Sequence, residues 1–271
     1  MPNQRNNLRD TALRVIARTR RRTAPADPGL DIRLVNEPVF VLCPTRSGST
    51  LLRLILNTHS QIRAPHELQL NSLRVSPRRE GHVDKPMAQM GVTFLDLENM
   101  LWDRILYELL VTSGKNIIVD KTPQNSADWQ RIHAYWPRAR YLHLRRHPAA
   151  ILQSRISSLE EQPMERHLRL INTWGRQLNA SRAALPGLTV RYEDLTTNPQ
   201  EVMQAICRYL GVAWEPAMLD YDTRRGSEIL YGLGDHSETI RAGRVQAARR
   251  LPEASEVPDA LRTLTEQWGY L

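Results

Sequence analysis

The sequence of 271 residues contains no long apolar run, only two cysteines and few aromatic side chains. A membrane-spanning helix needs roughly 20 consecutive apolar residues, and no stretch of this chain approaches that length. The charged N-terminus also lacks the apolar stretch of a secretory signal. These absences lead us to expect a cytoplasmic protein with no transmembrane segment.

The scarcity of cysteine also limits the kinds of site that the chain can build. Cys43 ends an apolar run and Cys207 sits in a helical pattern, and their spacing suggests neither a disulfide nor a metal site. The histidines show no metal-ligand spacing such as HExxH either. We therefore expect two buried cysteines and no bound metal.

What the chain has in excess is positive charge. Its formal net charge of +8 predicts a polyanionic partner, a class that includes nucleic acid, a membrane surface and a phosphorylated cofactor. A groove for nucleic acid usually interleaves aromatic and basic residues, and an aromatic content of 6% argues against one.

Much of the excess charge lies in arginines before residue 25, and a Pro-rich linker follows them. Proline there would break any helix that started upstream. We expect a basic arm and linker at residues 1–29 and a single domain at residues 30–271. The arm is expected to be solvated, with anchoring to a surface or docking to an acidic protein as the alternatives.

Short apolar runs alternate with helical patterns along the rest of the chain. The runs, typical of buried parallel strands, cover 38–43, 117–119, 141–144 and 188–190. The helical patterns cover 49–57, 101–110, 149–158, 167–184 and 200–210. This order predicts an α/β, P-loop-like three-layer fold in which helices flank a central, mainly parallel sheet. Two segments without clear periodicity, 75–91 and 224–250, are predicted to be loops.

The most informative stretch joins the first strand to the first helix and reads Pro44-Thr-Arg-Ser-Gly-Ser-Thr-Leu-Leu52. Gly48 lets the backbone approach a ligand closely, and the N–H groups of the first helical turn favour an anion there. Arg46 adds a fixed positive charge, and hydroxyls come from Ser47, Ser49 and Thr50. The turn lacks the Lys and the first Gly of the GxxxxGK[ST] loop, which argues against a P-loop kinase.

A second basic site is predicted at the end of a later strand, in Leu144-Arg-Arg-His-Pro148. The carboxyl ends of parallel strands face the crevice where open α/β sheets bind ligands. An arginine fork there can clamp a phosphate in bidentate fashion, and Ser154 on the following helix can add a hydroxyl.

Together the two motifs resemble those of the sulfotransferases that use 3′-phosphoadenosine 5′-phosphosulfate (PAPS). In that family a loop of the form RSGTTLL holds the 5′-phosphosulfate, and an RxP segment with a serine eight residues later holds the 3′-phosphate. The resemblance implies that the residues from Arg46 to Leu51, with Arg146 and Ser154, bind PAPS and its product adenosine 3′,5′-bisphosphate. It covers roughly residues 37–250.

Two later segments extend the resemblance. The stretch Arg191-Tyr-Glu-Asp-Leu195 looks like the family's late strand and helix, which places Tyr192 near the nucleotide. Arg244, which follows Gly243, resembles the family's basic loop over the cofactor, although Val245 replaces the Trp often found there.

The segment Arg63-Ala-Pro-His-Glu-Leu68 is similar to the tyrosylprotein sulfotransferases and to the sulfotransferase domains of polyketide synthases. By that similarity Glu67 is the candidate general base, with His66 as its rival, because an acceptor hydroxyl must lose its proton as it attacks sulfur. Lys121 resembles the family's catalytic lysine, which would offset charge on the bridging oxygen. Catalysis by positioning and electrostatics leads us to expect turnover without a metal.

The resemblance implies transfer to a hydroxyl of a small molecule or natural product, either free or presented by an acyl carrier protein. It does not imply a nucleic-acid partner. Two other readings stay open at this point: a P-loop kinase that acts on a small molecule with ATP, and a basic nucleic-acid-binding module.

Overall fold

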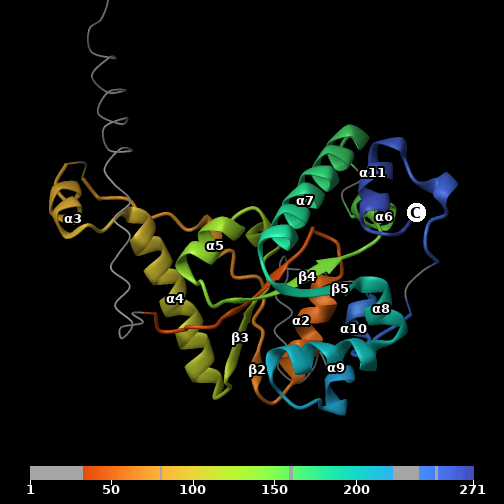
Figure 1. Cartoon of the computed structure of the whole chain (residues 1–271), viewed down its shortest axis with the longest axis horizontal. Helices are drawn as coiled ribbons and strands as arrows, with labels where there is room; N and C mark the ends of the chain where they lie inside the picture. The colour runs from red at the N-terminus through yellow and green to blue at the C-terminus, as the bar shows by residue number, and fades with distance from the viewer. Residues whose placement is uncertain (1–32, 80, 159–160, 222–237, 248–249) are drawn as a thin grey trace, which may run out of the picture. The chain divides into compact units, whose positions relative to one another are not determined.

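The computed structural model of the chain describes residues 33–79, 81–158, 161–221, 238–247 and 250–271. A five-stranded sheet with the order β2-β3-β1-β4-β5 lies at its centre (Figure 1), and all neighbouring strands are parallel. The strands are β1 (Val39–Leu42), β2 (Ile62–Arg63), β3 (Ile117–Asp120), β4 (Arg140–Arg145) and β5 (Gly187–Arg191). The expected arm at 1–29 lies outside the described residues.

Strand β1 shows how one short strand serves both faces of the sheet. Val39, Val41 and Cys43 pack into one apolar cluster, and Phe40 and Leu42 pack into another. Because side chains alternate along a strand, a strand that is covered on both faces must be apolar throughout. All five side chains are fully buried. Both cysteines of the chain are buried and free, as expected.

Helices cover both faces of the sheet, which confirms the predicted three-layer α/β fold (Figure 1). One face packs against α2 and α9, and the other packs against α4, α5, α6, α7 and α11. The helices are α2 (Ser49–Thr58), α3 (Asp84–Met90), α4 (Phe94–Ser113), α5 (Trp129–Tyr135), α6 (Pro148–Ile156), α7 (Met164–Ala184), α8 (Tyr192–Thr197), α9 (Pro199–Leu210), α10 (Glu238–Arg241) and α11 (Asp259–Gln267).

Short 3-10 turns connect several of these elements. They are η1 (Leu70–Ser72), η2 (Pro123–Ser126), η3 (Pro216–Leu219) and η4 (Ala254–Glu256). Within the described ranges, no helix combines the length and the apolar character that crossing a membrane requires.

The predicted loop over residues 75–91 is only partly a loop, because it contains α3 at Asp84–Met90. Pro86 is tolerated there because it lies in the first turn, where a missing N–H costs no intrahelical hydrogen bond. Gly91 ends the helix with a φ of 69°. The predicted loop at 224–250 is described only in part, and its described residues include the single turn α10.

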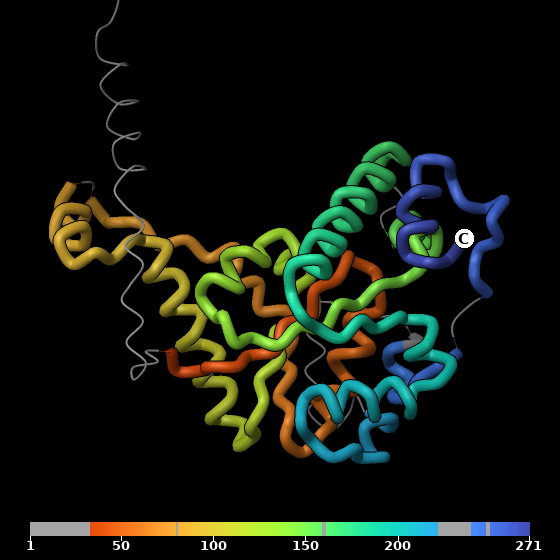
Figure 2. The backbone as a smooth tube through the Cα atoms, viewed as in Figure 1, coloured from red at the N-terminus to blue at the C-terminus, as the bar shows by residue number. Residues whose placement is uncertain are grey.

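The last helix, α11, was not predicted, and it packs against α6 and α7 (Figure 2). Gly175 in α7 permits this contact, because a Cβ there would lie 2.5 Å from Leu264 Cδ2. The contact brings the end of the described chain to the loop after β4, where a predicted anion site lies. The packing therefore supports the site described next.

Candidate active site

The turn between β1 and α2 is shaped by two residues with positive φ. Gly48, the N-cap of α2, has a φ of 86°, and a Cβ on it would lie 2.1 Å from Cδ2 of the Tyr192 ring. Arg46 has a φ of 66°, which is unusual for a residue other than glycine. The turn thus has no room for a side chain at Gly48, and the Tyr192 ring covers it.

The two predicted anion sites meet at this turn. The Arg46 Nε donates a hydrogen bond of 3.1 Å to the Ser154 hydroxyl, which comes from α6. The Arg146 guanidinium donates to the Arg46 carbonyl oxygen at 3.0 Å and lies over the Tyr192 ring, 4.4 Å from its centroid. Four residues predicted from three segments of the sequence are therefore linked by a continuous chain of contacts.

A cavity of about 740 Å³ opens beside these residues. Its lining includes the predicted general base, Glu67, and eight predicted cofactor-binding residues: Arg46, Gly48, Ser49, Thr50, Leu51, Arg146, Ser154 and Tyr192. Ser47 is fully buried beneath the turn. The cavity is large enough for a nucleotide-sized ligand.

The donors around this cavity fit a ligand with phosphate-like groups. The first N–H groups of α2 have no acceptor inside the helix, and the helix dipole adds partial positive charge at that end. No acidic residue lies in the first turn of α2 to oppose an anion. The Thr45 hydroxyl is buried, and no described residue forms a hydrogen bond with it. Two arginines complete a cationic wall.

Glu67 and Lys121 form an ion pair at the neighbouring strand ends of β2 and β3. The Lys121 ammonium donates to Glu67 Oε1 at 2.5 Å. The Lys121 side chain is 1% exposed and that of Glu67 is 14% exposed, so the pair is largely screened from water. Glu67 lines the cavity, whereas Lys121 is not among the described residues that line it. Glu67 is therefore the member of the pair that faces the space where a ligand would lie, and Lys121 lies behind it.

The rival candidate, His66, has its Nδ1 3.1 Å from the Glu67 carbonyl oxygen. It does not line the cavity within the part of the chain that the structure describes. Arg244 is exposed and does not line it either, although its carbonyl oxygen accepts a hydrogen bond of 3.0 Å from the Tyr221 hydroxyl. Tyr221 does line the cavity. The roles of His66 and Arg244 stay predictions.

Several residues around the cavity were not predicted from the sequence. Ser157 and Ser158 line it, and both hydroxyls donate to the Ser154 carbonyl oxygen. Their spacing of three and four from Ser154 puts all three on one helical face, a signal that the sequence did contain. Asp120, which precedes Lys121, was missed because nothing in its surroundings in the sequence marks it.

Asp120 is a buried carboxylate behind the ion pair. It accepts hydrogen bonds of 3.0 Å from Trp102 Nε1 and 3.0 Å from the Thr122 hydroxyl. Burial raises the pKa of Asp120 to about 6, although hydrogen bonds from Thr122, Trp102 and Asn125 and the charge of Lys121 all act to lower it. The Asp120 carboxyl therefore titrates closer to neutral pH than an ordinary aspartate does.

The end of the described chain supports the second anion site. The Tyr270 hydroxyl donates to Glu193 Oε2 at 2.5 Å, and Glu193 Oε1 accepts a hydrogen bond of 2.9 Å from the His147 backbone N–H. Arg191 lies over the Tyr270 ring at 4.3 Å. His147 follows Arg146, so Tyr270, which lies just after α11, helps to fix the loop that carries this arginine.

Comparison with known proteins identifies relatives of this chain. A model of the sulfotransferase family matches residues 38–216. The chain is 25% identical to protein-tyrosine sulfotransferase 1 of Danio rerio over 203 residues, which are 68% of this chain and 56% of that protein. It is 24% identical to protein-tyrosine sulfotransferase A of Caenorhabditis elegans over 206 residues, 70% of this chain and 54% of that protein. The chain thus spans about half the length of these relatives.

Among solved structures, the chain is similar to the sulfotransferase domain of the Synechococcus PCC 7002 olefin synthase. The identity is 25% and the TM-score 0.63, and the match covers 89% of this chain and 97% of that domain. A sulfotransferase domain from the curacin biosynthetic pathway shares the fold at 22% identity and a TM-score of 0.52, covering 86% of this chain and 90% of that domain.

Proposed function

This chain belongs to the sulfotransferase family, and on that premise we propose that it transfers the sulfuryl group of PAPS to a hydroxyl of a small molecule. The observation that carries the proposal is the contact between the two anion sites, in which Arg46 meets both Arg146 and Ser154 at the edge of one cavity. A nucleotide with phosphate-like groups at two positions requires such a double site. A single phosphate-binding loop would hold only one of these groups.

The residues present fit the donor. The turn from Arg46 to Leu51 would hold the 5′-phosphosulfate, and Arg146 with Ser154 would hold the 3′-phosphate. Tyr192, which already lies under Arg146, would lie beside the nucleotide. When bound, PAPS supplies the sulfuryl group and leaves as adenosine 3′,5′-bisphosphate.

Glu67 is the proposed general base, and its Oε1 would accept the proton of the acceptor hydroxyl. Lys121, whose ammonium contacts that same oxygen, would offset the negative charge that develops as the sulfuryl group is transferred. Such stabilisation acts on the transition state more than on the bound substrate. Both side chains are largely shielded from water, so solvent weakens their electrostatic interactions less than it would at an exposed site.

The proposed acceptor is a small molecule or a natural product, free or attached to a carrier protein. The likeness to the olefin synthase domain supports this choice, because it extends over 89% of the chain and 97% of that domain. The protein-tyrosine sulfotransferases are matched over little more than half of their length, 56% in the first example.

The test is a transfer assay with PAPS labelled in its sulfate. Hydroxylated small molecules, the same compounds attached to a carrier protein, and tyrosine peptides are offered in parallel. We expect label on one of the first two classes, and about a hundredfold lower rate for Glu67→Gln and for Lys121→Met. Label on tyrosine peptides alone would contradict the proposed acceptor, and no label on any class would contradict the proposed reaction.

A further inference from the structure

The segment that follows Glu67 is tied to the strand end that carries Lys121. The backbone N–H of Gln69 donates to the Thr122 hydroxyl at 3.3 Å, and this hydroxyl donates to Asp120 Oδ1 at 3.0 Å. Thr122 and Asp120 flank Lys121, and Gln69 lies two residues after Glu67. The two members of the ion pair are therefore joined by a second connection, which is independent of their own contact.

The backbone of Gln69 adopts an unusual conformation, which contacts from its surroundings must stabilise. Gln69 has a φ of 52°, in the left-handed region that residues other than glycine seldom adopt. Strained residues persist where their surroundings determine the conformation, and they gather at functional sites. Gln69 is also the N-cap of η1, and its carbonyl oxygen accepts a hydrogen bond of 2.6 Å from the Ser72 hydroxyl. The turn is thus held on both sides.

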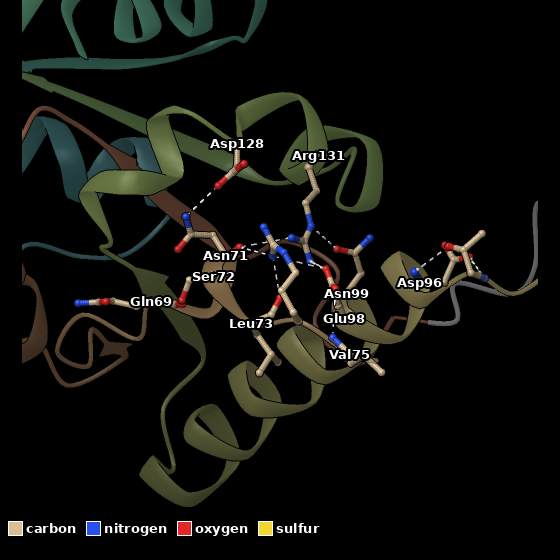
Figure 3. Close-up of polar contacts among 12 residues, drawn as sticks. Gln69, Asn71, Ser72, Leu73, Val75, Asp96, Glu98, Asn99, Asp128 and Arg131 are labelled. Atoms are coloured by element: carbon tan, nitrogen blue, oxygen red, sulfur yellow. Dashed lines mark hydrogen bonds and ion pairs between the residues drawn. The ribbon is translucent and has the colours of Figure 1, made fainter. Parts of the chain in front are cut away.

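The far end of the same segment is held by Glu98 of α4 (Figure 3). Its side chain is 8% exposed, and its Oε1 accepts a hydrogen bond of 3.1 Å from the Val75 backbone N–H. Glu98 Oε2 lies 3.4 Å from an Arg131 nitrogen and 3.6 Å from an Arg74 nitrogen. These contacts come from α4 and α5, so two helices fix the end of the segment.

A further contact lies between these two anchors. The Asn71 side-chain amide donates to Asp128 Oδ2 at 2.8 Å (Figure 3). The Arg131 Nε donates to the Asn99 side chain at 2.8 Å, which keeps the guanidinium beside Glu98. Asn71 and Glu98 are buried, and paired polar groups in a buried setting make a segment more rigid. The segment 67–75 is therefore held near its start, at Asn71 and at its end.

We propose that Asp120, Thr122 and Glu98 are positioning residues that hold Glu67 in register with Lys121. The proposal rests on the proposed function, in which these two side chains carry the proton and the charge. Thr122 with Asp120 forms the near anchor of the segment, and Glu98 forms the far anchor. Neither anchor needs to touch a substrate. A displacement of about 1 Å at a reacting group can lower a rate about a hundredfold, so loss of an anchor slows transfer without weakening the nucleotide site.

Thr122→Val tests the near anchor, because valine keeps the shape and the extended backbone of Thr122 but removes the hydroxyl. Thr265→Val is the matched control: it removes a buried hydroxyl that donates to the Leu261 carbonyl oxygen at 2.7 Å within α11. Thr122→Ser restores the hydroxyl and serves as the rescue. Glu98→Gln tests the far anchor with little change in volume.

Two readouts separate positioning from a loss of fold. Hydrogen exchange of the peptide covering residues 66–75 needs no substrate, and we expect it to be faster in Thr122→Val and Glu98→Gln than in Thr265→Val. With labelled PAPS and an accepting compound, we expect kcat to fall at least about tenfold in the two test variants. The affinity for adenosine 3′,5′-bisphosphate should stay within about twofold, and Thr122→Ser should recover the rate.

The proposal is overturned if exchange in 66–75 is unchanged, or if kcat in Thr122→Val equals that in Thr265→Val. It is also overturned if Thr122→Ser, with the hydroxyl restored, stays as slow as the valine variant. A wild-type chain that transfers no label from PAPS contradicts the proposed function instead, and the exchange comparison would still show whether the anchors hold the segment.

Discussion

Gly48 is a position where two independent constraints exclude a side chain. Its φ of 86° would cost alanine about 1–2 kcal/mol, and the new Cβ would lie 2.1 Å from the Tyr192 ring. We expect Gly48→Ala to lower the free energy of unfolding and to weaken binding of adenosine 3′,5′-bisphosphate about tenfold or more, because the ring must leave its place. Chemical denaturation and calorimetric titration measure the two effects.

Gly114→Ala is the control for backbone strain alone. Gly114 has a φ of 65°, and nothing lies within 4 Å of the position of its Cβ. We expect Gly48→Ala to lower the free energy of unfolding more than Gly114→Ala does. This difference should shrink when Tyr192 is also changed to alanine, because the clash is then removed. Equal unfolding free energies for the two glycine variants would show that Tyr192 does not press on the turn.

The buried carboxyl of Asp120 predicts a pH dependence of stability. Burial raises its pKa from 3.8 to about 6, so between these values the folded chain holds a proton that the unfolded chain has lost. The contribution of Asp120 to stability is therefore largest below about pH 4 and falls as the pH rises to about 6. Asp120→Asn does not titrate, so its stability relative to wild type should improve across this window.

Urea denaturation at several values between about pH 4 and pH 7 measures this difference. Asp259→Asn is the control, because the Asp259 side chain is fully exposed, and it should follow the wild type at every pH. Parallel curves for wild type and Asp120→Asn would contradict the raised pKa.

Single residues also show what could be read from the sequence. Arg46, Gly48, Arg146 and Ser154 were predicted from local spacing, because each motif lies at a strand end and the parallel sheet brings such ends to one edge. The hydrogen bond between Gln69 and Thr122 joins residues 53 positions apart. Nothing in the sequence near either residue marks such a contact, so the anchors of Glu67 could not be predicted.

At the scale of elements, helix α2 depends on a lysine from another part of the chain. The last turn of α2 contains no basic residue. Lys115, which precedes β3, donates from its ammonium to the carbonyl oxygens of Asn57 at 2.7 Å, His59 at 3.0 Å and Ile62 at 2.9 Å. This one cation satisfies carbonyls at the end of the helix whose N-terminus forms the anion site.

We expect Lys115→Met to lower the free energy of unfolding by about 2 kcal/mol, because three carbonyl oxygens lose a charged donor. Chemical denaturation measures the change. The control is Lys85→Met, since Lys85 is exposed on α3. If the two variants are equally stable, the capping of α2 by Lys115 contributes nothing.

Elements were predicted well where a periodic pattern is strong. The apolar runs became β1, β3, β4 and β5. The pattern is strongest in β1, which is buried at every position, because a strand covered on both faces has to be apolar along its length. Helix α4 begins at Phe94, earlier than the predicted 101, since Thr93 and Asp96 form a capping box. Strand β2, with two residues, is too short for any pattern, although it leads into the segment that carries Glu67.

For the whole molecule, the account predicts catalysis by positioned charges without a metal. We expect sulfuryl transfer to be unchanged after incubation with EDTA and dialysis, because two arginines, a lysine and backbone N–H groups supply the positive charge. The measurement is the rate of label transfer before and after chelation. A rate that falls on chelation and returns with Mg²⁺ would contradict this prediction.

The central claim is that the joined anion sites bind a nucleotide with a 3′-phosphate. Calorimetric titration with adenosine 3′,5′-bisphosphate, with ATP and 5′-AMP as comparisons, tests it most directly. We predict micromolar binding of the bisphosphate, at least about tenfold weaker binding of the other two, and loss of binding in Arg146→Ala but not in the control Arg169→Ala, an exposed site on α7. A preference for ATP, or an Arg146→Ala variant that binds as the wild type does, would contradict the claim.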